Sequence, residues 1–283
     1  MFNFPIGAML ESFRLPTPEA IKKAEEIGAQ GIQMYATYGE HAPENMTPAK
    51  ISELKKMMND SGLVFSALCG DLGHGFANAE KNPELVEKSK RILDLAVELG
   101  TNVVTTHIGV VPSDSSNPRY SVMRSACLEL AEYADSLGAH FAIETGPEKA
   151  VVLRSFLDSL GSKGVAVNLD PANLVMVVGD DPVKAVYELK DYIVHTHAKD
   201  GIRLDERDPE VIYGLKTDPV KHNGAAFQEV PLGTGGVDFA KYLAALEDVG
   251  FRGFLTIERE CGDDPASDIA AAAQFLRNTI KAN

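Results

Sequence analysis

The sequence predicts an α/β protein of the (β/α)8 class, a TIM barrel in which residues 1–283 form a single domain. Two observations lead to this prediction. A helical stretch that ends in glycine and is followed by an apolar, β-rich run recurs along the chain, as in EIGAQGIQMY and VELGTNVVTTH. Eight strand candidates alternate with helix candidates over 283 residues. Strict alternation with short connections is typical of a parallel sheet, and eight units are the number that closes a barrel.

The expected strands are the apolar runs that separate the helix candidates. An open doubly wound sheet is the alternative topology, but no GxGxxG motif follows the first strand to support it. We expect strands at 5–10, 31–35, 63–69, 102–107, 140–144, 165–170, 192–198 and 253–258.

The expected helices are delimited by residues suited to their ends. Six glycines stand where a left-handed residue ends a helix before a strand, namely Gly28, Gly62, Gly100, Gly138, Gly161 and Gly250. Four pairs predict helix starts with the first residue as the cap, namely Thr17-Pro18, Thr47-Pro48, Asn82-Pro83 and Asp181-Pro182. Within 82–100, positions 85, 89, 92, 96 and 99 form one stripe of an amphipathic helix.

The longest irregular stretch, residues 199–236, lies between the seventh strand and its helix. In a barrel, every loop that follows a strand lies on the catalytic face. A loop much longer than about a dozen residues is usually functional, so we expect a lid or a substrate-facing insert here. Its glycines 233, 235 and 236, in LGTGG, could offer backbone amides to a phosphate.

The chain is acidic, with a formal net charge of −14. This charge repels a nucleic acid unless a local basic patch overcomes it, and the sequence contains none. The N-terminal segment lacks the features of an export signal, and no apolar run reaches the roughly 18 residues of a membrane span. Cys69, Cys127 and Cys261 are far apart and fit reduced thiols. We expect a cytoplasmic protein with no membrane partner, and the sequence is compatible with a homo-oligomer.

Four consecutive strands end in residues that can bind a metal ion. Strand five ends in Glu144, strand six in Asp170, strand seven in His197 and strand eight in Glu258. Unpaired carboxylates in such a cluster repel one another, and a divalent cation is the ordinary way to hold them together. An oxygen-rich set with one imidazole suits Mn²⁺ first, with Mg²⁺ or Co²⁺ as alternatives. His195 shares the parity of His197 but lies one layer deeper, where a structural role is expected.

Other polar residues near the expected mouth are candidates for substrate contact. His107 ends strand four, where a core histidine is the equal alternative, and His74 lies in a glycine-rich loop that forms either a mobile wall or a turn. Lys199 directly follows the strand of His197 and could orient either that ligand or the substrate. Tyr35 ends strand two and could cover a sugar ring, although packing is its more common role.

Five motifs resemble one known family, namely AIETGP, NLDPANL, HTHAKDG, VPLGTGGVDF and GFLTIERE. They look like the xylose-isomerase-like TIM-barrel superfamily, in particular the sugar phosphate isomerase/epimerase group that includes the ketose 3-epimerases. The resemblance covers nearly the whole chain. It implies that Glu144, Asp170, His197 and Glu258 bind one divalent metal ion, and that Glu144 and Glu258 are the catalytic acid–base pair on opposite sides of the substrate.

The resemblance also implies substrate contacts. Arg203, six residues after His197, matches an arginine that binds substrate hydroxyls in the ketose epimerases. Asn173 stands where those epimerases carry a substrate-binding histidine, and Ala150 stands where they carry a glutamate. Asn173 therefore becomes a candidate substrate contact, and both departures argue against a D-tagatose or D-psicose enzyme in particular.

The expected function is that of a metal-dependent enzyme acting on a small sugar or polyol. The first hypothesis is a ketose or ketose-phosphate epimerase or isomerase, in which proton transfer passes through a metal-bound cis-enediolate. A leaving group β to the carbonyl would instead give dehydration, as in the inosose and dehydroshikimate dehydratases of the superfamily. A non-catalytic carbohydrate-binding protein is the third reading. The superfamily's three-zinc apurinic endonuclease is disfavoured because Asn173 replaces a required histidine and the chain is acidic.

Overall fold

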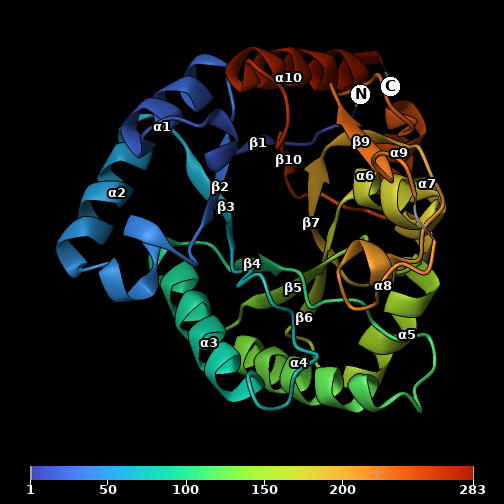
Figure 1. Ribbon diagram of the computed structural model, residues 1–283. Helices are drawn as coiled ribbons and strands as arrows, with labels where there is room; N and C mark the ends of the chain where they lie inside the picture. The colour runs from blue at the N-terminus through green and yellow to red at the C-terminus, as the bar shows by residue number, and fades with distance from the viewer. Residues whose placement is uncertain (1, 221, 283) are drawn as a thin grey trace.

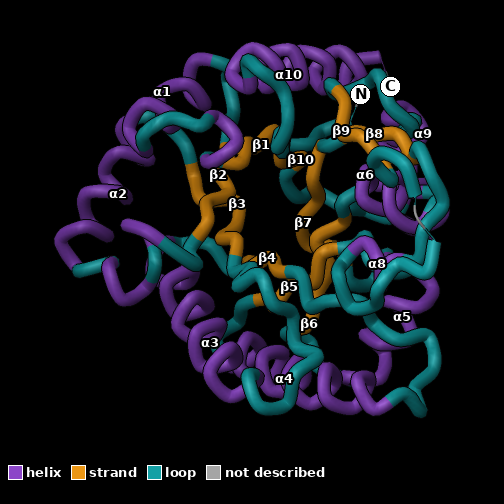
Figure 2. The backbone as a smooth tube through the Cα atoms, in the orientation of Figure 1, coloured by secondary structure: helices purple, strands orange, loops and turns teal. Residues whose placement is uncertain are grey.

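The computed structural model describes residues 2–220 and 222–282. Residue 221 of the expected insert and the two end residues of the expected domain lie outside the described residues. Eight parallel strands close into a barrel in the spatial order β1-β10-β7-β6-β5-β4-β3-β2, seen as the ring in Figure 2. The closed ring confirms the (β/α)8 class and excludes the open sheet. The strands are β1 Ile6–Met9, β2 Gly31–Tyr35, β3 Val64–Cys69, β4 Val103–Thr106, β5 His140–Glu144, β6 Val165–Leu169, β7 Ile193–Ala198 and β10 Leu255–Ile257.

Helices surround the ring (Figure 1). The main ones are α1 Thr17–Glu26, α2 Pro48–Asp60, α3 Asn82–Leu99, α4 Pro118–Ser136, α5 Ala150–Leu160, α7 Pro182–Leu189, α9 Phe239–Asp248 and α10 Pro265–Ala282. Short turns of helix near the loops are η1 Glu11–Phe13, η2 Gly39–His41, η3 Pro43–Asn45, α6 Pro171–Asn173, the π-helix η4 Leu174–Val178, and α8 Pro209–Ile212. No helix in the described part of the chain combines the length and apolar character that a membrane span requires.

The predicted helix ends are confirmed at most junctions. All six marker glycines adopt a left-handed backbone, and Gly100 and Gly161 directly cap α3 and α5. Thr47 and Asp181 cap α2 and α7 through their side chains, as expected.

The caps predicted at Thr17 and Asn82 are wrong, because each residue is already the first of its helix. The Thr17 hydroxyl instead donates to Glu40 Oε1 at 2.8 Å, and the Asn82 amide donates to the Phe76 carbonyl at 3.0 Å. Both side chains therefore serve contacts to neighbouring loops instead of the first free amides of the helix.

Two parts of the core are separated by the sheet, and a third cluster, Ala172, Met176 and Val177, lies in α6 and η4. The larger part fills the space between the strands and the helices, and it includes the predicted stripe of α3. The smaller part lies inside the barrel below the mouth and consists of Ala67, Val103, Ala142 and Ala166. Small side chains at this level leave the next layer, toward the carboxyl ends of the strands, to polar side chains.

The segment between β7 and α9 forms an antiparallel hairpin and a short helix. Strands β8 Asp200–Arg203 and β9 Phe227–Val230 pair with each other, and α8 lies between them in sequence. Glu229 of β9 is buried and accepts from the Arg259 guanidinium at 2.5 Å and from the Glu260 amide at 3.2 Å. These bonds fasten the hairpin to the loop that follows β10.

The base of this insert is closed by one buried carboxylate. Asp200 Oδ2 accepts from the amides of Gly233 and Gly235 at 3.0 and 2.9 Å, and Oδ1 accepts from Val237 at 3.1 Å. The Gly236 amide bonds to the Gly201 carbonyl at 2.8 Å. The expectation that these glycines offer amides to a phosphate is therefore wrong, because the chain's own groups already occupy them.

Candidate metal centre at the barrel mouth

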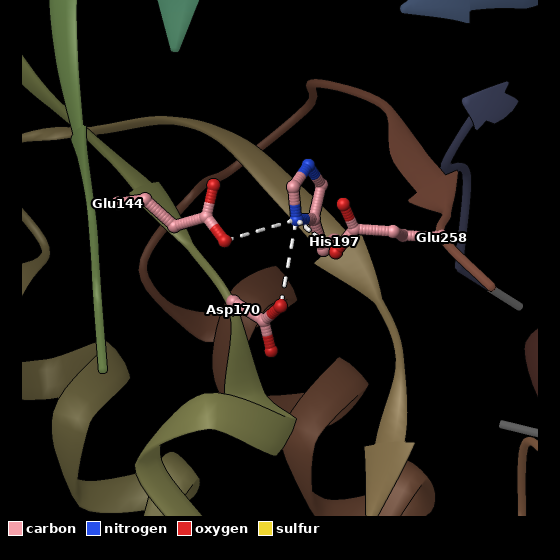
Figure 3. A group of neighbouring side chains, drawn as sticks. All are labelled: Glu144, Asp170, His197 and Glu258. Carbon is pink, nitrogen blue, oxygen red and sulfur yellow. Dashed lines mark ion pairs between the residues drawn. The ribbon is translucent and has the colours of Figure 1, made fainter. Parts of the chain in front are cut away.

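Four side chains meet where β5, β6, β7 and β10 end (Figure 3). Glu144 is the last residue of β5, Asp170 directly follows β6, His197 is the penultimate residue of β7, and Glu258 directly follows β10. One ligand atom from each residue lies within 4.8 Å of the other three, and all four residues are buried. The structure therefore brings together the cluster expected from the strand ends.

His197 Nδ1 is the atom on which this cluster converges. It lies 3.5 Å from Glu144 Oε1, 3.4 Å from Asp170 Oδ2 and 3.2 Å from Glu258 Oε2. Figure 3 shows Glu144 and Glu258 on opposite sides of the imidazole, with Asp170 between them. Three carboxylates thus surround one ring nitrogen.

The other nitrogen of His197 is held by an amide. His197 Nε2 lies 3.0 Å from Gln33 Oε1, and Gln33 Nε2 donates to Thr105 Oγ1 at 2.9 Å. Because the amide oxygen can only accept, Nε2 of His197 carries a proton, and Nδ1 is the nitrogen that faces the carboxylates.

The residues present fit a divalent cation. His197 Nδ1 and Asp170 Oδ2 are both buried and have no hydrogen-bond partner among the described residues. Buried polar atoms are normally hydrogen-bonded, and these two lie 3.4 Å apart without a hydrogen bond, so a cation between them would satisfy both. Three carboxylates and one imidazole would supply a hard to borderline divalent ion with its protein ligands.

The buried charges shift one another's protonation. Burial lowers the pKa of His197, but Glu258 and Glu144 outweigh burial and hold this pKa well above its ordinary value. Burial raises the pKa of Glu258, but Lys199 and His197 hold it well below its ordinary value. The pKa of Glu144 is also lowered, because His107 and His197 outweigh its burial. Both glutamates are therefore ionised at neutral pH, as metal binding and proton abstraction require.

A polar layer beneath the cluster orients its members. Asn168 Nδ2 donates to Glu144 Oε2 at 3.0 Å, and Asn168 Oδ1 accepts from His195 Nδ1 at 2.9 Å. His195 Nε2 lies 2.9 Å from the Thr256 hydroxyl. Burial, its largest influence, keeps the pKa of His195 well below its ordinary value, so this imidazole is neutral. His195 thus supports the cluster from the deeper layer.

Three further residues contact the glutamates. Lys199 is buried, and its Nζ donates to Glu258 Oε2 at 3.0 Å and also pairs with Glu260. Asn173 Nδ2 donates to Glu144 Oε1 at 3.1 Å. His107 Nε2 lies 3.5 Å from the same Oε1 atom. The structure therefore places Lys199, Asn173 and His107 beside the candidate metal ligands.

Arg203 and His74, two of the predicted substrate contacts, do not lie beside the four-residue cluster. Arg203 ends β8 and lines a cavity together with Glu148 and Val177, none of which belongs to the four-residue cluster. His74 is exposed and lines a separate cavity between the loops after β2 and β3, with Asp71. The structure does not join His74 to the cluster by any described contact.

A comparison with known protein families shows to which family the chain belongs. The model of the family described as xylose isomerase-like TIM barrel matches residues 21–279. The chain belongs to this family.

Several solved structures share the whole fold. A xylose isomerase domain protein from Planctomyces limnophilus is 26% identical, with a TM-score of 0.79 over 99% of this chain and 97% of that chain. The probable 3-DHS dehydratase AsbF of Bacillus anthracis is 20% identical, with a TM-score of 0.75 over 97% and 99%. The 3-keto-D-glucoside 4-epimerase YcjR of E. coli is 17% identical, with a TM-score of 0.74 over 97% and 99%.

The xylose isomerase-like barrel also contains site residues that the sequence reading did not name. Gln33 and Asn168 are polar residues within otherwise apolar strands, at positions whose side chains face the barrel interior. This pattern could have marked them as site residues in the sequence. Tyr213 and Glu148 carry no such signal, because loops place them. Burial raises the pKa of the Tyr213 hydroxyl, and so does the negative charge of Glu144 and Glu148, which lie near it.

Proposed function

We propose that the protein is a divalent-metal-dependent sugar epimerase or isomerase that transfers a proton at a carbon next to a carbonyl group. The observation that carries the proposal is the pair of ionised glutamates on opposite sides of His197 Nδ1 (Figure 3). We assign Glu144, Asp170, His197 and Glu258 as ligands of one ion, with Mn²⁺ first and Mg²⁺ or Co²⁺ as alternatives.

The metal ion, when bound, polarises a carbonyl oxygen of the substrate and makes the neighbouring C–H bond more acidic. The protein's own residues then move the proton. One of Glu144 and Glu258 removes it, and the other returns a proton to the opposite face, which inverts the carbon. Return of the proton to the adjacent carbon would isomerise the sugar instead.

Neighbouring residues tune these two glutamates. Lys199 stabilises the carboxylate form of Glu258 through its 3.0 Å contact. Asn173 and His107 both lie within 3.5 Å of Glu144 Oε1, where they can hold the carboxylate or hydrogen-bond substrate hydroxyls. We assign Arg203 to a more distant part of the substrate. His74 stays a candidate only for the outer rim of the mouth, because it lines a separate cavity.

A dehydratase is the second candidate. The same glutamates would remove the proton, and a leaving group β to the carbonyl would depart. AsbF, a probable dehydratase, shares the fold over nearly the full length of both chains, as does the epimerase YcjR. The fold therefore accommodates both reaction classes, and the products distinguish them.

The test is incubation of the Mn²⁺-loaded protein with a panel of ketoses and cyclitols in D₂O. Deuterium at a carbon beside the carbonyl, read by NMR, supports the epimerase or isomerase, whereas an unsaturated product supports the dehydratase. The Glu258→Gln variant should lose exchange by about 10²-fold or more, because proton transfer by a positioned side chain contributes this much.

Two controls make the result decisive. Metal content should be measured on the Glu258→Gln protein, so that lost exchange is separated from a lost ion. Glu53→Gln changes an exposed glutamate of α2 and should leave exchange unchanged. Exchange by Glu258→Gln at the parent rate would rule out the acid–base role, and a fully folded protein that exchanges none of the panel would favour a carbohydrate-binding protein.

A further inference from the structure

A cavity of about 600 Å³ lies among the loops after β4 and β5, the end of η4 and the insert. Its apolar wall includes Val110, Val152 and Val177, and its polar lining includes Glu148 and Arg203. None of the four candidate metal ligands lines it. A volume of this size accommodates a small organic molecule or the distal half of one.

Two buried polar atoms on its lining residues have no partner among the described residues. One is Glu148 Oε1, on a side chain that is 6% exposed, and the other is Arg203 Nε. The second oxygen of Glu148 is used, because it accepts from the Val111 amide at 3.0 Å. Buried groups of this kind are normally paired, so both residues keep unused hydrogen-bonding capacity beside this cavity.

The backbone around Arg203 is shaped to receive it. Gly179 caps the π-helix η4 with φ +60°, and a Cβ atom at this position would lie only 2.4 Å from Arg203 Nη1. Any other residue would displace the guanidinium. Single π-helical turns occur frequently at functional sites, and Val177 and Val178 of this one line the same cavity.

Arg203 differs from the other cations in the described part of the insert in having no acidic partner. Arg207 pairs with Asp205, and Lys216 pairs with Asp208. Arg203 forms no ion pair with any residue in the described ranges, in a chain whose net charge is −14. An unpaired, half-buried guanidinium among apolar walls favours an anionic ligand.

The cavity adjoins the metal centre. Glu148, which lines the cavity, lies four residues after Glu144 in the loop that follows β5. Asn173 donates to Glu144 and directly precedes η4, whose Val177 lines the cavity. Two short segments therefore connect the cavity to the metal centre, and we take one substrate to reach both.

We propose that this cavity binds a carboxylate group of the substrate through Arg203, with Glu148 hydrogen-bonding a neighbouring hydroxyl. The inference rests on the proposed function, since it takes the ligand to be the molecule that reacts at the metal centre. The substrates would then be keto sugar acids or carboxylated cyclitols, whether the reaction is an epimerisation or a dehydration.

A carboxylate fits better than a phosphate. The planar guanidinium matches the two oxygens of a carboxylate, and one fixed cation balances a single negative charge. Lys149 and Glu206, both exposed lining residues, carry opposite charges.

Calorimetric titration of the Mn²⁺-loaded protein tests the proposal with matched ligands. L-sorbose, 5-keto-D-gluconate and L-sorbose 6-phosphate differ only in their terminal group, and two further sets of ketose, keto acid and ketose phosphate would be included. In at least one set, the keto acid should bind about tenfold to hundredfold more tightly than the other two, the contribution expected of a charged hydrogen-bonded pair.

Variants connect this preference to Arg203. Arg203→Gln should abolish the preference at unchanged metal content, and Arg203→Lys should restore part of it. Arg207→Gln is the matched control, because Arg207 lines the same cavity but is already paired. Any of three results would overturn the proposal. These are no preference for the keto acid in any set, a preference for the phosphate, or an equal loss of the preference in Arg203→Gln and Arg207→Gln. Calorimetry measures binding directly and does not depend on catalysis. If the protein prefers the keto acid but exchanges no deuterium in D₂O, only the proposed catalysis is contradicted.

Discussion

Gln33 determines which nitrogen of His197 faces the carboxylates. Its amide oxygen accepts from Nε2 and its amide nitrogen is committed to Thr105, so the orientation of the amide is fixed as well. A polar residue within a buried strand is therefore explained by the metal centre above it. Such supporting residues orient a ligand and raise its basicity.

Replacement of Gln33 by leucine should weaken Mn²⁺ binding by about 10-fold to 100-fold, because His197 loses the acceptor that holds its tautomer. Competition with a fluorescent chelator measures the affinity. Gln30→Leu is the control, since Gln30 is exposed and precedes β2 at the opposite end of the barrel. Equal affinities of Gln33→Leu and the parent would show that Gln33 does not position the ligand.

Glu148 gives the protein a specific pH dependence. Burial raises its pKa from 4.5 to about 8. Between pH 4.5 and about 8, Glu148 keeps its proton in the folded protein but has lost it in the unfolded chain. Glu148 therefore lowers the free energy of unfolding as the pH rises through this range. Glu148→Gln cannot ionise and escapes this loss.

The free energy of unfolding of Glu148→Gln relative to the parent should therefore increase from pH 5 to pH 8, by about 1–4 kcal/mol. Urea denaturation at several pH values measures it, with Glu53→Gln as the exposed control. A difference that stays constant with pH would show that Glu148 ionises normally in the folded protein.

At the scale of elements, the strand ends position the site and the insert is anchored at its base. The sequence predicted the alternation, the strand ranges and the cluster of Glu144, Asp170, His197 and Glu258, because side-chain period and end-capping glycines are local signals. It did not predict the hairpin of the insert, because β8 and β9 are short and their pairing depends on Asp200 and Glu229, which act across the chain.

Replacing Asp200 by alanine should lower the free energy of unfolding by about 2–4 kcal/mol, because several buried amides lose their acceptor. Urea denaturation measures this change. Asp208→Ala removes the exposed cap of the short helix α8 and a surface ion pair with Lys216, and it should cost no more than about 1 kcal/mol. A similar small loss for Asp200→Ala would mean that the insert is held by its other contacts.

At the scale of the whole molecule, distant loops combine into features that no local pattern could predict. The cavity beside the metal centre is formed by loops after β4 and β5 together with η4 and the insert. Glu148, Tyr213 and the unpaired state of Arg203 became visible only once these segments were packed together. The four converging strand ends could therefore be predicted from the sequence, whereas the loop residues around them that select a substrate could not.

We propose above all that the barrel mouth holds one divalent metal ion through His197 Nδ1 and three carboxylates. Anomalous diffraction from Mn²⁺-soaked crystals, recorded on both sides of the manganese edge, tests it most directly. We expect a single strong peak bonded to Nδ1 of His197 and to oxygens of Glu144, Asp170 and Glu258, with Nε2 still on Gln33. No peak among these residues, or a manganese ion bound through Nε2, would contradict it.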